Sequence, residues 1–282
     1  MSLLFHSPQH VVRTPARLHS VVVALLLLPC GVKAVQSPVG PDSGDSTRSQ
    51  VSVLLAQADG AVRDFDNKRA LALYSEALAM ESGNADILWR ISRSFVDIGE
   101  HLPSATDAEK QKQLEMYEHA LEIAGESVAA DDKNSMAYTY HAIALSRVAL
   151  FKGFWEYVGI LKDIKVDLEK AIALDSTNHL AYYSLGMACL KAAERPWIFR
   201  WPMGIGWANT ARALKNLEKA ASLRQDMIRY QLASARALVE EGDYPSARVR
   251  LLQIPLLRTR DENDEQYRRE ARELLDRIKD EE

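Results

Sequence analysis

The residues that could do chemistry in this chain are few and scattered. Three of its seven histidines, His6, His10 and His19, lie in the first 34 residues. The other four, His101, His119, His141 and His179, show neither the His-x-x-x-His nor the His-Glu-x-x-His spacing of a metal site. The segment 204–206 (GIG) lacks the preceding strand and the third glycine of a nucleotide-binding loop. A Gly-x-Ser-x-Gly motif and a lysine-bearing phosphate loop are both absent from the sequence. We therefore predict a protein that is not an enzyme and has no catalytic residue, no metal site and no cofactor.

Composition narrows the class of partner. Of the 282 residues, 47% are hydrophobic, which is enough for a substantial core. The formal net charge of −4 offers no basic field to a nucleic-acid backbone, so we predict no nucleic-acid partner. A protein or peptide partner, or a phospholipid-like ligand with contact to a membrane surface, remains open.

A repeated helical unit must position any binding residues. The segment LEKAIAL at 168–174 returns as LEKAASL at 217–223. Such self-similarity is typical of a solenoid, in which each unit buries its apolar face on its neighbours. Small or apolar residues also recur at spacings of four and three, which place each triplet on one helix face. The triplets are Ala70, Tyr74, Ala77; Ala120, Ala124, Ser127; Ile164, Leu168, Ala171; Ala213, Leu217, Ala220; and Ala247, Leu251, Ile254.

The spacing of the triplets predicts the architecture. Ala220 and Ile254 are 34 residues apart, which is the length of a tetratricopeptide repeat, and the earlier intervals are longer. We predict an all-α, tetratricopeptide-like right-handed solenoid of about five helical hairpins over residues 51–282, with a capping helix near the C-terminus. Residues 35–50 are rich in Ser, Pro, Gly and Asp and are expected to form a flexible linker.

The first 34 residues differ from the rest of the chain. They contain no Asp or Glu, and the apolar run 21–28 follows Arg13 and Arg17. This pattern is typical of a signal peptide, and it predicts an exported protein, periplasmic or secreted. An uncleaved N-terminal anchor or a mitochondrial presequence is the alternative.

Two aromatic insertions interrupt the repeats, near 151–160 and 194–207. In a solenoid, equivalent insertions emerge on one edge, so we expect the two segments to lie close together. They either pack on each other as a plug or form a lip for an apolar ligand, an acyl chain or a membrane surface. The lip residues are Phe154, Trp155, Trp197, Trp201 and Trp207.

The first helices of the hairpins are expected to line a concave groove of mixed basic and apolar character. The residues predicted to face it are Trp89, Arg93, Arg147, Tyr183, Met187, Lys191, Arg229 and Arg236. Such a groove could accept an anionic head group with an apolar tail, or an acidic peptide. The alternative is that the arginines only pair with nearby carboxylates such as Asp97 or Glu240.

Three stretches of the sequence carry a family resemblance: 88–93 (LWRISR), 168–174 (LEKAIAL) and 193–197 (AERPW). Together with their order, they resemble the tetratricopeptide-like domain of the regulator of microtubule dynamics family over about residues 55–280. The resemblance implies association with microtubules or mitochondria and, in one branch, binding and movement of phospholipids. Secreted bacterial proteins share this domain, and the N-terminal segment indicates such a member.

The leading hypothesis is a non-enzymatic helical-repeat protein that holds a lipid-like or amphipathic ligand in its concave groove. The alternative is a protein–protein interaction scaffold that grips a peptide or a cytoskeletal partner such as a microtubule.

Overall fold

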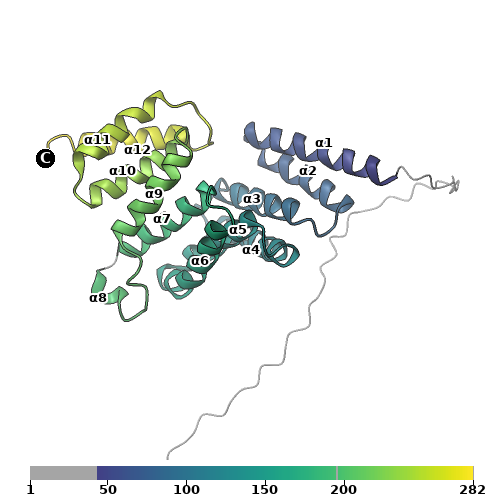
Figure 1. Ribbon diagram of the computed structural model, residues 1–282, viewed down its shortest axis with the longest axis horizontal. Coiled ribbons are helices and arrows are strands. Elements are labelled where there is room, and N and C mark those ends of the chain that lie inside the picture. The colour runs from purple at the N-terminus through teal and green to yellow at the C-terminus, as the bar shows by residue number, and fades with distance from the viewer. Residues whose placement is uncertain (1–42, 195, 282) are drawn as a thin grey trace, which may run out of the picture. The chain divides into compact units, whose positions relative to one another are not determined.

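Antiparallel helix pairs follow one another along residues 43–194 and 196–281, which the computed structural model describes (Figure 1). The elements are α1 (Ser43–Arg63), α2 (Asn67–Met80), α3 (Ala85–Glu100), α4 (Asp107–Ala130), α5 (Ser135–Lys152), α6 (Phe154–Leu174), α7 (His179–Ala193), α8 (Trp197–Arg200), α9 (Thr210–Leu223), α10 (Ile228–Glu240), α11 (Tyr244–Gln253), the 3-10 turn η1 (Ile254–Leu256) and α12 (Asp264–Arg277). This described part contains no β-strand. The pairs are α1–α2, α3–α4, α5–α6, α7–α9 and α10–α11, and α12 packs on the last pair. The predicted all-α, tetratricopeptide-like solenoid of helical hairpins is therefore confirmed.

Helix α1 begins at Ser43, earlier than the expected start of the repeats at residue 51. The last part of the expected linker, 43–50, is therefore helical, and it continues into the first hairpin. Residues 35–42 of that linker and the predicted leader 1–34 lie outside the described residues.

Asparagines begin the first helix of three successive pairs. Asn84, Asn134 and Asn178 are the N-caps of α3, α5 and α7, and each side-chain oxygen accepts hydrogen bonds from backbone N–H groups of the first turn. The same side chains join neighbouring repeats. Asn134 donates to the Asp86 carboxylate at 2.9 Å, and Asn178 donates to the Thr139 hydroxyl at 2.9 Å. These two caps therefore fix both a helix start and the packing of one repeat on the next.

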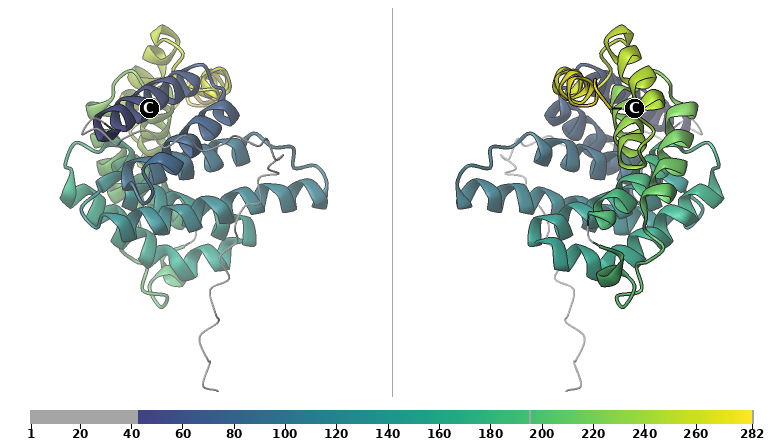
Figure 2. Two further views of the ribbon diagram at one scale, coloured as in Figure 1. Left: turned by 90° about the vertical axis from the view of Figure 1, so that its right-hand side faces the viewer. Right: turned by 90° about the vertical axis from the view of Figure 1, so that its left-hand side faces the viewer.

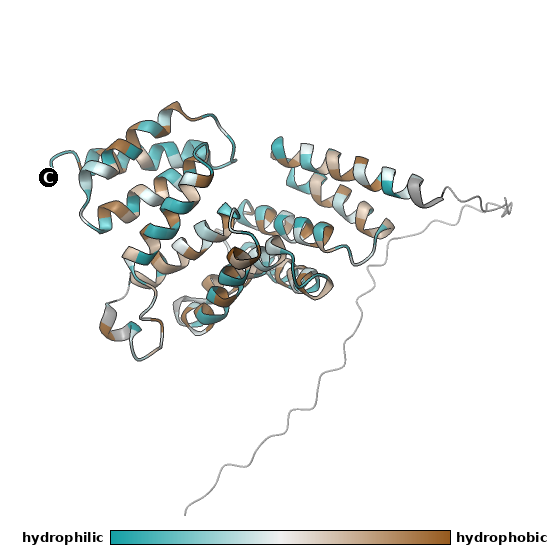
Figure 3. Ribbon diagram, in the orientation of Figure 1, coloured by the Kyte–Doolittle hydropathy of each residue, from teal (hydrophilic) through white to brown (hydrophobic). Residues whose placement is uncertain are grey.

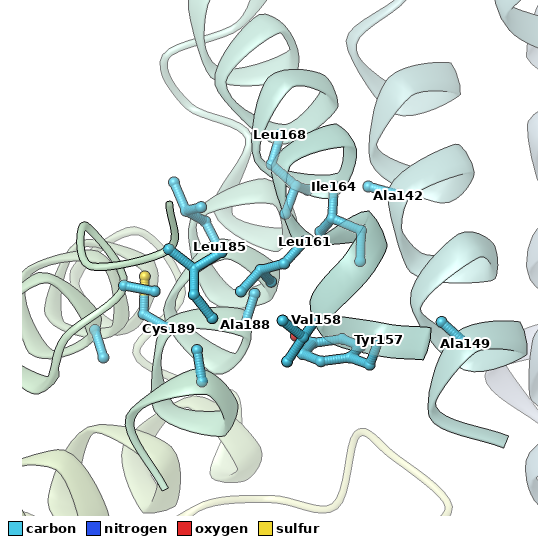
Figure 4. Packing of buried hydrophobic residues seen from close by; sticks show 14 of the residues in the cluster. Ala142, Ala149, Tyr157, Val158, Leu161, Ile164, Leu168, Leu185, Ala188 and Cys189 are labelled. Carbon is cyan, nitrogen blue, oxygen red and sulfur yellow. The ribbon is translucent and has the colours of Figure 1, made fainter. Parts of the chain in front are cut away.

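Every residue of the five triplets is buried, so these faces form the seams between helices. Small side chains let the backbones approach closely. A Cβ atom on Gly186 of α7 would lie 2.6 Å from Cγ of Leu217 on α9, which leaves no room for a side chain there. The largest apolar cluster joins α5, α6, α7 and α9, with Leu161, Leu168 and Leu185 at its centre (Figure 4).

The three intervals between triplets that exceed 34 residues contain extra residues, and the structure places these extra residues in different ways. In the first, α4 is lengthened, and its first turns extend beyond the neighbouring helices (Figure 2). In the second, α5 and α6 are both long, and only Gly153, with a φ of 119°, separates them. The 151–160 segment is therefore a corner between two helices and not a projecting loop. The third expansion is a loop that contains the short helix α8.

The last helix, α12, closes the C-terminal end of the solenoid. Its sequence is dominated by charged residues, and Figure 3 shows it mostly in the hydrophilic colour. Ala271, Leu274 and, just after the helix, Ile278 are buried against α10 and α11. A polar outer face over a narrow apolar stripe is what a terminal cap of a solenoid requires.

Candidate functional site

A cavity of about 770 Å³ lies inside the solenoid. Its wall is formed by α3, α5, α7 and α10, by the turn between α1 and α2, by the start of α12 and by the segment before α12. The lining residues recur at helical spacing, as with Met136, Tyr140, Ile143 and Arg147 of α5, because one face of each helix looks inward. The first helices therefore line an inner space, and we refer to it as the inner cavity.

The segment Leu257–Asn263, which we call the strap, crosses one side of the inner cavity. On its C-terminal side it is held firmly, because the Asp264 carboxylate accepts from the backbone N–H groups of Arg260 and Asp261 at 2.6 and 2.9 Å. On the other side, Glu262 lies 3.4 Å from Nε2 of His101 and 3.5 Å from Nδ2 of Asn67. The strap thus brings the C-terminal pair to the first two pairs, as the loop beside the end of α1 shows (Figure 1).

The three predicted arginines of the cavity wall are held by groups of the protein itself. Arg147 is paired with Glu100, and Arg229 lies 3.1 Å from Asp261 of the strap. Arg93 donates to the Tyr74 hydroxyl at 2.9 Å, and that hydroxyl donates in turn to Asp59. These contacts agree with the alternative given above, in which the arginines pair with neighbouring groups of the protein.

Aromatic rings form part of the apolar share of the wall. Trp89 is buried behind Tyr140 and stacks on it with ring centres 5.4 Å apart. Tyr183 packs against Tyr230 at 4.7 Å, and the Arg229 guanidinium lies over both rings at 5.5 and 5.3 Å. The cationic and aromatic side chains are therefore interleaved, which holds the wall in place.

Burial alters the ionisation of several groups in the wall. It raises the pKa of Asp97 to about 7; Arg93 opposes the shift, while Glu100 adds to it. Burial lowers the pKa of His179 to about 4, and Arg224 and Arg229 contribute in the same direction. His179 is therefore neutral at physiological pH, and its Nδ1 lies 2.7 Å from the Tyr230 hydroxyl.

The structure divides the eight predicted groove residues among three places. Arg93, Arg147, Tyr183 and Arg229 line the inner cavity. Met187, Lys191 and Arg236 line a separate hollow of about 500 Å³ between α7, α10 and α12. There, Lys191 is paired with Glu194 at 2.9 Å, and Arg236 with Glu270 at 2.6 Å. Trp89 is only 8% exposed, and its ring stacks on that of Tyr140.

The predicted aromatic lip is not one cluster. Trp155 and Trp201 are 69% and 74% exposed. Trp207 is half-buried between Lys165 and Arg212, whose cationic groups lie 5.5 and 5.2 Å from its ring centre. The side chains of Phe154 and Trp197 lie outside the described part of the structure. Trp207 thus lies against α6 and α9, while Trp155 and Trp201 are exposed.

Sequence reasoning missed several residues of the cavity wall. Tyr140 precedes Arg147 by seven residues and so lies on the same helix face, a relation that would have identified it. Tyr267 and the strap residues Asp261 and Glu262 also line the cavity. No periodicity marks them, because they belong to a loop and a capping helix that reach the cavity only in the folded chain.

Fold and cavity together define a tetratricopeptide-like helical-repeat protein. A family model for Regulator of microtubule dynamics protein 1-3 matches residues 54–279, and the chain belongs to this family. The expected family is therefore confirmed.

Individual relatives are distant. Regulator of microtubule dynamics protein 1 of Pongo abelii is 29% identical over 152 residues, which cover 54% of this chain and 46% of that protein. Regulator of microtubule dynamics protein 3 of Bos taurus is 24% identical over 57% of this chain and 34% of that protein. The chain thus spans about half or less of the length of these relatives. A thermophilic tetratricopeptide-repeat protein of Thermus thermophilus has a TM-score of 0.57 and 15% identity over 80% of this chain and 98% of its own, which shows a shared fold.

The expectation of an exported protein is wrong. The relatives that match are vertebrate proteins named as regulators of microtubule dynamics, which contradicts the expectation of a periplasmic or secreted protein. The segment 1–34 resembled a leader because it joins basic residues to an apolar run, and that composition alone does not establish export. Among the helices of the described residues, none has the length and apolar character needed to cross a membrane.

Proposed function

We propose that the protein is a non-enzymatic interaction scaffold that holds a segment of a partner protein in its inner cavity. The observation that carries this proposal is the cavity itself, which is lined by four repeat helices and is large enough for several side chains. Family membership agrees with it, since the relatives are named as regulators of microtubule dynamics and have a helical-repeat domain in common with this chain. A microtubule-associated protein is the kind of partner that these names suggest.

The character of the wall favours a peptide over an acyl chain. Charged groups such as Arg93, Asp97, Glu100 and Arg229 face the same space as the tyrosine rings. An acyl chain would remove these charges from water without giving them hydrogen-bond partners, which is unfavourable. A peptide offers backbone and side-chain groups to the polar part of the wall and apolar side chains to the rings. The lipid-like ligand of the leading sequence hypothesis thus becomes an outcome to be tested.

Site-specific photo-crosslinking in the cell of origin would test the proposal. A photoreactive amino acid replaces Ser184, which lines the inner cavity on α7, and the crosslinked partner is mapped by mass spectrometry. Lys219 is the matched control, because it is exposed on the outer helix α9. We expect position 184, and not position 219, to crosslink to a defined segment of one protein.

Two results would contradict the scaffold. Crosslinks at position 184 that map to phospholipid, together with phospholipid retained in native mass spectra of the purified chain, would support the lipid-like ligand instead. Identical crosslinked proteins at positions 184 and 219 would show that the cavity does not select its occupant.

A further inference from the structure

Asp97 differs from the other acidic side chains that line the inner cavity. Glu100 is paired with Arg147, Asp261 with Arg229, and Glu262 lies next to His101. Asp175 accepts from the Thr177 hydroxyl at 2.7 Å. Among the described residues, none donates a hydrogen bond to the Asp97 carboxylate or forms an ion pair with it. Asp97 is thus an acid of the cavity wall whose charge the protein leaves unpaired.

The nearest positive charge is engaged elsewhere. Arg93 precedes Asp97 by one turn of α3, and it attracts that carboxylate. Its guanidinium, however, donates to the Tyr74 hydroxyl of α2 at 2.9 Å and lies 3.9 Å from Asp59 of α1. Because Arg147 and Arg229 are also paired, the wall's unmatched charge at this point is negative, contrary to the anionic ligand expected from the arginines.

The surroundings of Asp97 suit the stem of a long basic side chain. Tyr140 lines the inner cavity together with Asp97, and its ring stacks on Trp89, which holds it in place. Tyr183 and Val96 also line this space. Lysine and arginine carry an aliphatic stem that packs on apolar and aromatic surface while the charged end reaches a carboxylate.

We propose that the segment held in the inner cavity presents a lysine or an arginine to Asp97. This inference rests on the proposed scaffold function, and it defines the class of partner as one with a basic recognition residue. The basic group supplies the hydrogen bonds and the charge that the carboxylate lacks, so the pair should be a main source of specificity.

The proposal implies that binding strengthens as pH rises. Asp97 binds a cation as the carboxylate, and its pKa of about 7 means that it is largely protonated in mildly acidic solution. If only the ionised form binds, affinity should rise about 30-fold between about pH 5.5 and about pH 8.5. The other titratable and charged groups that line the cavity are Arg63 at the end of α1, Arg93 and Glu100 on α3, His101 just after α3, Tyr140 and Arg147 on α5, Asp175 before α7, His179 and Tyr183 on α7, Arg224 before α10, Arg229 on α10, Arg260, Asp261 and Glu262 on the strap and Tyr267 on α12.

His101 must be separated from Asp97 in that experiment. Its pKa is raised, because the Asp97 backbone carbonyl and Glu262 outweigh the burial that lowers it. His179 has a pKa of about 4 and stays neutral over this range. The pH series is therefore measured on the full chain and on His101→Gln, and the rise should persist in the variant.

Selection of short random peptides on the immobilised full chain provides the probe. Peptides that also bind Ser184→Trp, which places a bulky ring in the cavity, are removed. Each remaining peptide is titrated against the full chain, against Asp97→Asn and against the matched control Asp163→Asn, an exposed acid of α6. We expect a shared lysine or arginine and an affinity at least about 10-fold lower for Asp97→Asn, with Asp163→Asn unchanged.

A double-mutant cycle isolates the pair. Replacing the shared basic residue of the peptide by methionine should weaken binding to the full chain but have little further effect on Asp97→Asn. Peptides without a basic residue, or equal affinity for Asp97→Asn and the full chain, would overturn this inference and leave the scaffold proposal intact. If no peptide distinguishes the full chain from Ser184→Trp, the scaffold proposal fails and the inference fails with it. Circular dichroism confirms that each variant is folded.

Discussion

The seams between helices and the wall of the inner cavity differ in chemistry, even where one helix contributes residues to both. On α7, Gly186 and Leu185 face the seam, where no space remains between side chains. Tyr183 and Ser184, one or two residues earlier, face the cavity. The seam joins small apolar residues that need only close contact, whereas the wall joins charged and aromatic residues that need particular partners.

This difference separates what stabilises the molecule from what gives it a function. Seam residues contribute buried apolar area, so substitutions there should change stability and leave ligand recognition as it was. Wall residues such as Asp97 are half-buried and imperfectly paired, so their substitution should change recognition and even raise stability. The following predictions test that division, beginning with the largest expected effect.

Truncation of a seam residue should be the most damaging change. Leu217 is fully buried between α9 and α7, and Leu217→Ala should lower the free energy of unfolding by about 2–5 kcal/mol, through lost transfer energy and the cavity left behind. The matched control is Leu252→Ala on the exposed face of α11, which should change it by less than about 0.5 kcal/mol. Urea unfolding followed by circular dichroism measures both. Equal effects would contradict the assignment of Leu217 to a seam.

Adding a single methyl group to the seam should have the second-largest effect on stability. In Gly186→Ala the new Cβ would meet Leu217 at 2.6 Å, and the overpacking should cost about 1–3 kcal/mol of unfolding free energy. Gly125→Ala makes the same change in α4, where no atom lies within 4 Å, and it should stabilise the helix by up to about 1 kcal/mol. Thermal unfolding of the pair gives opposite signs if the seam at Gly186 is as tight as the structure indicates.

Substitution of a wall residue should raise the stability of the fold instead of lowering it. Burial raises the pKa of Asp97 to about 7, above its ordinary value, so the folded chain binds this proton more tightly than the unfolded chain. The resulting destabilisation is present above about pH 7 and is relieved as pH falls toward about 4. Asp97→Asn should therefore unfold several degrees higher than the parent chain at about pH 8, and the difference should shrink in acid. A difference that grows in acid would contradict this account of the wall.

Weakening the ion pair that holds the strap should give the smallest effect on stability. Glu262→Gln weakens the ion pair with His101, which is partly exposed, so the cost should be at most about 1 kcal/mol. Hydrogen exchange at 257–263 should then be up to about 5-fold faster, while the seams keep their protection. Glu273→Gln, an exposed acid of α12, is the control and should leave the strap unchanged. Faster exchange throughout the chain would mean that the pair stabilises the whole fold.

The same division explains what the sequence could predict. The triplets that end at Ala77, Ser127 and Ala171 revealed the seams, because packing between successive helices repeats at a fixed spacing along the chain. Arg93, Arg147, Tyr183 and Arg229 were also found, because their helix face follows from the same spacing.

The partners of these wall residues could not be found in this way. Asp261 reaches Arg229 from the segment before α12, and Glu262 reaches His101 because the two ends of the solenoid come together. No local pattern records a contact between residues so far apart. The unpaired state of Asp97 is equally a product of the folded chain, since Arg93, one turn away, contacts Tyr74 of α2 and Asp59 of α1.

The strap also affects how a bound segment could enter and leave the inner cavity. A segment with a free end could thread past Leu257–Asn263, whereas a loop between two folded domains that enters from this side would require Glu262 to release His101 and Asn67. For such a partner, association and dissociation would both be limited by the rate of that release. Complexes of moderate affinity could then be long-lived, and their lifetime would depend on a contact that the occupant never touches.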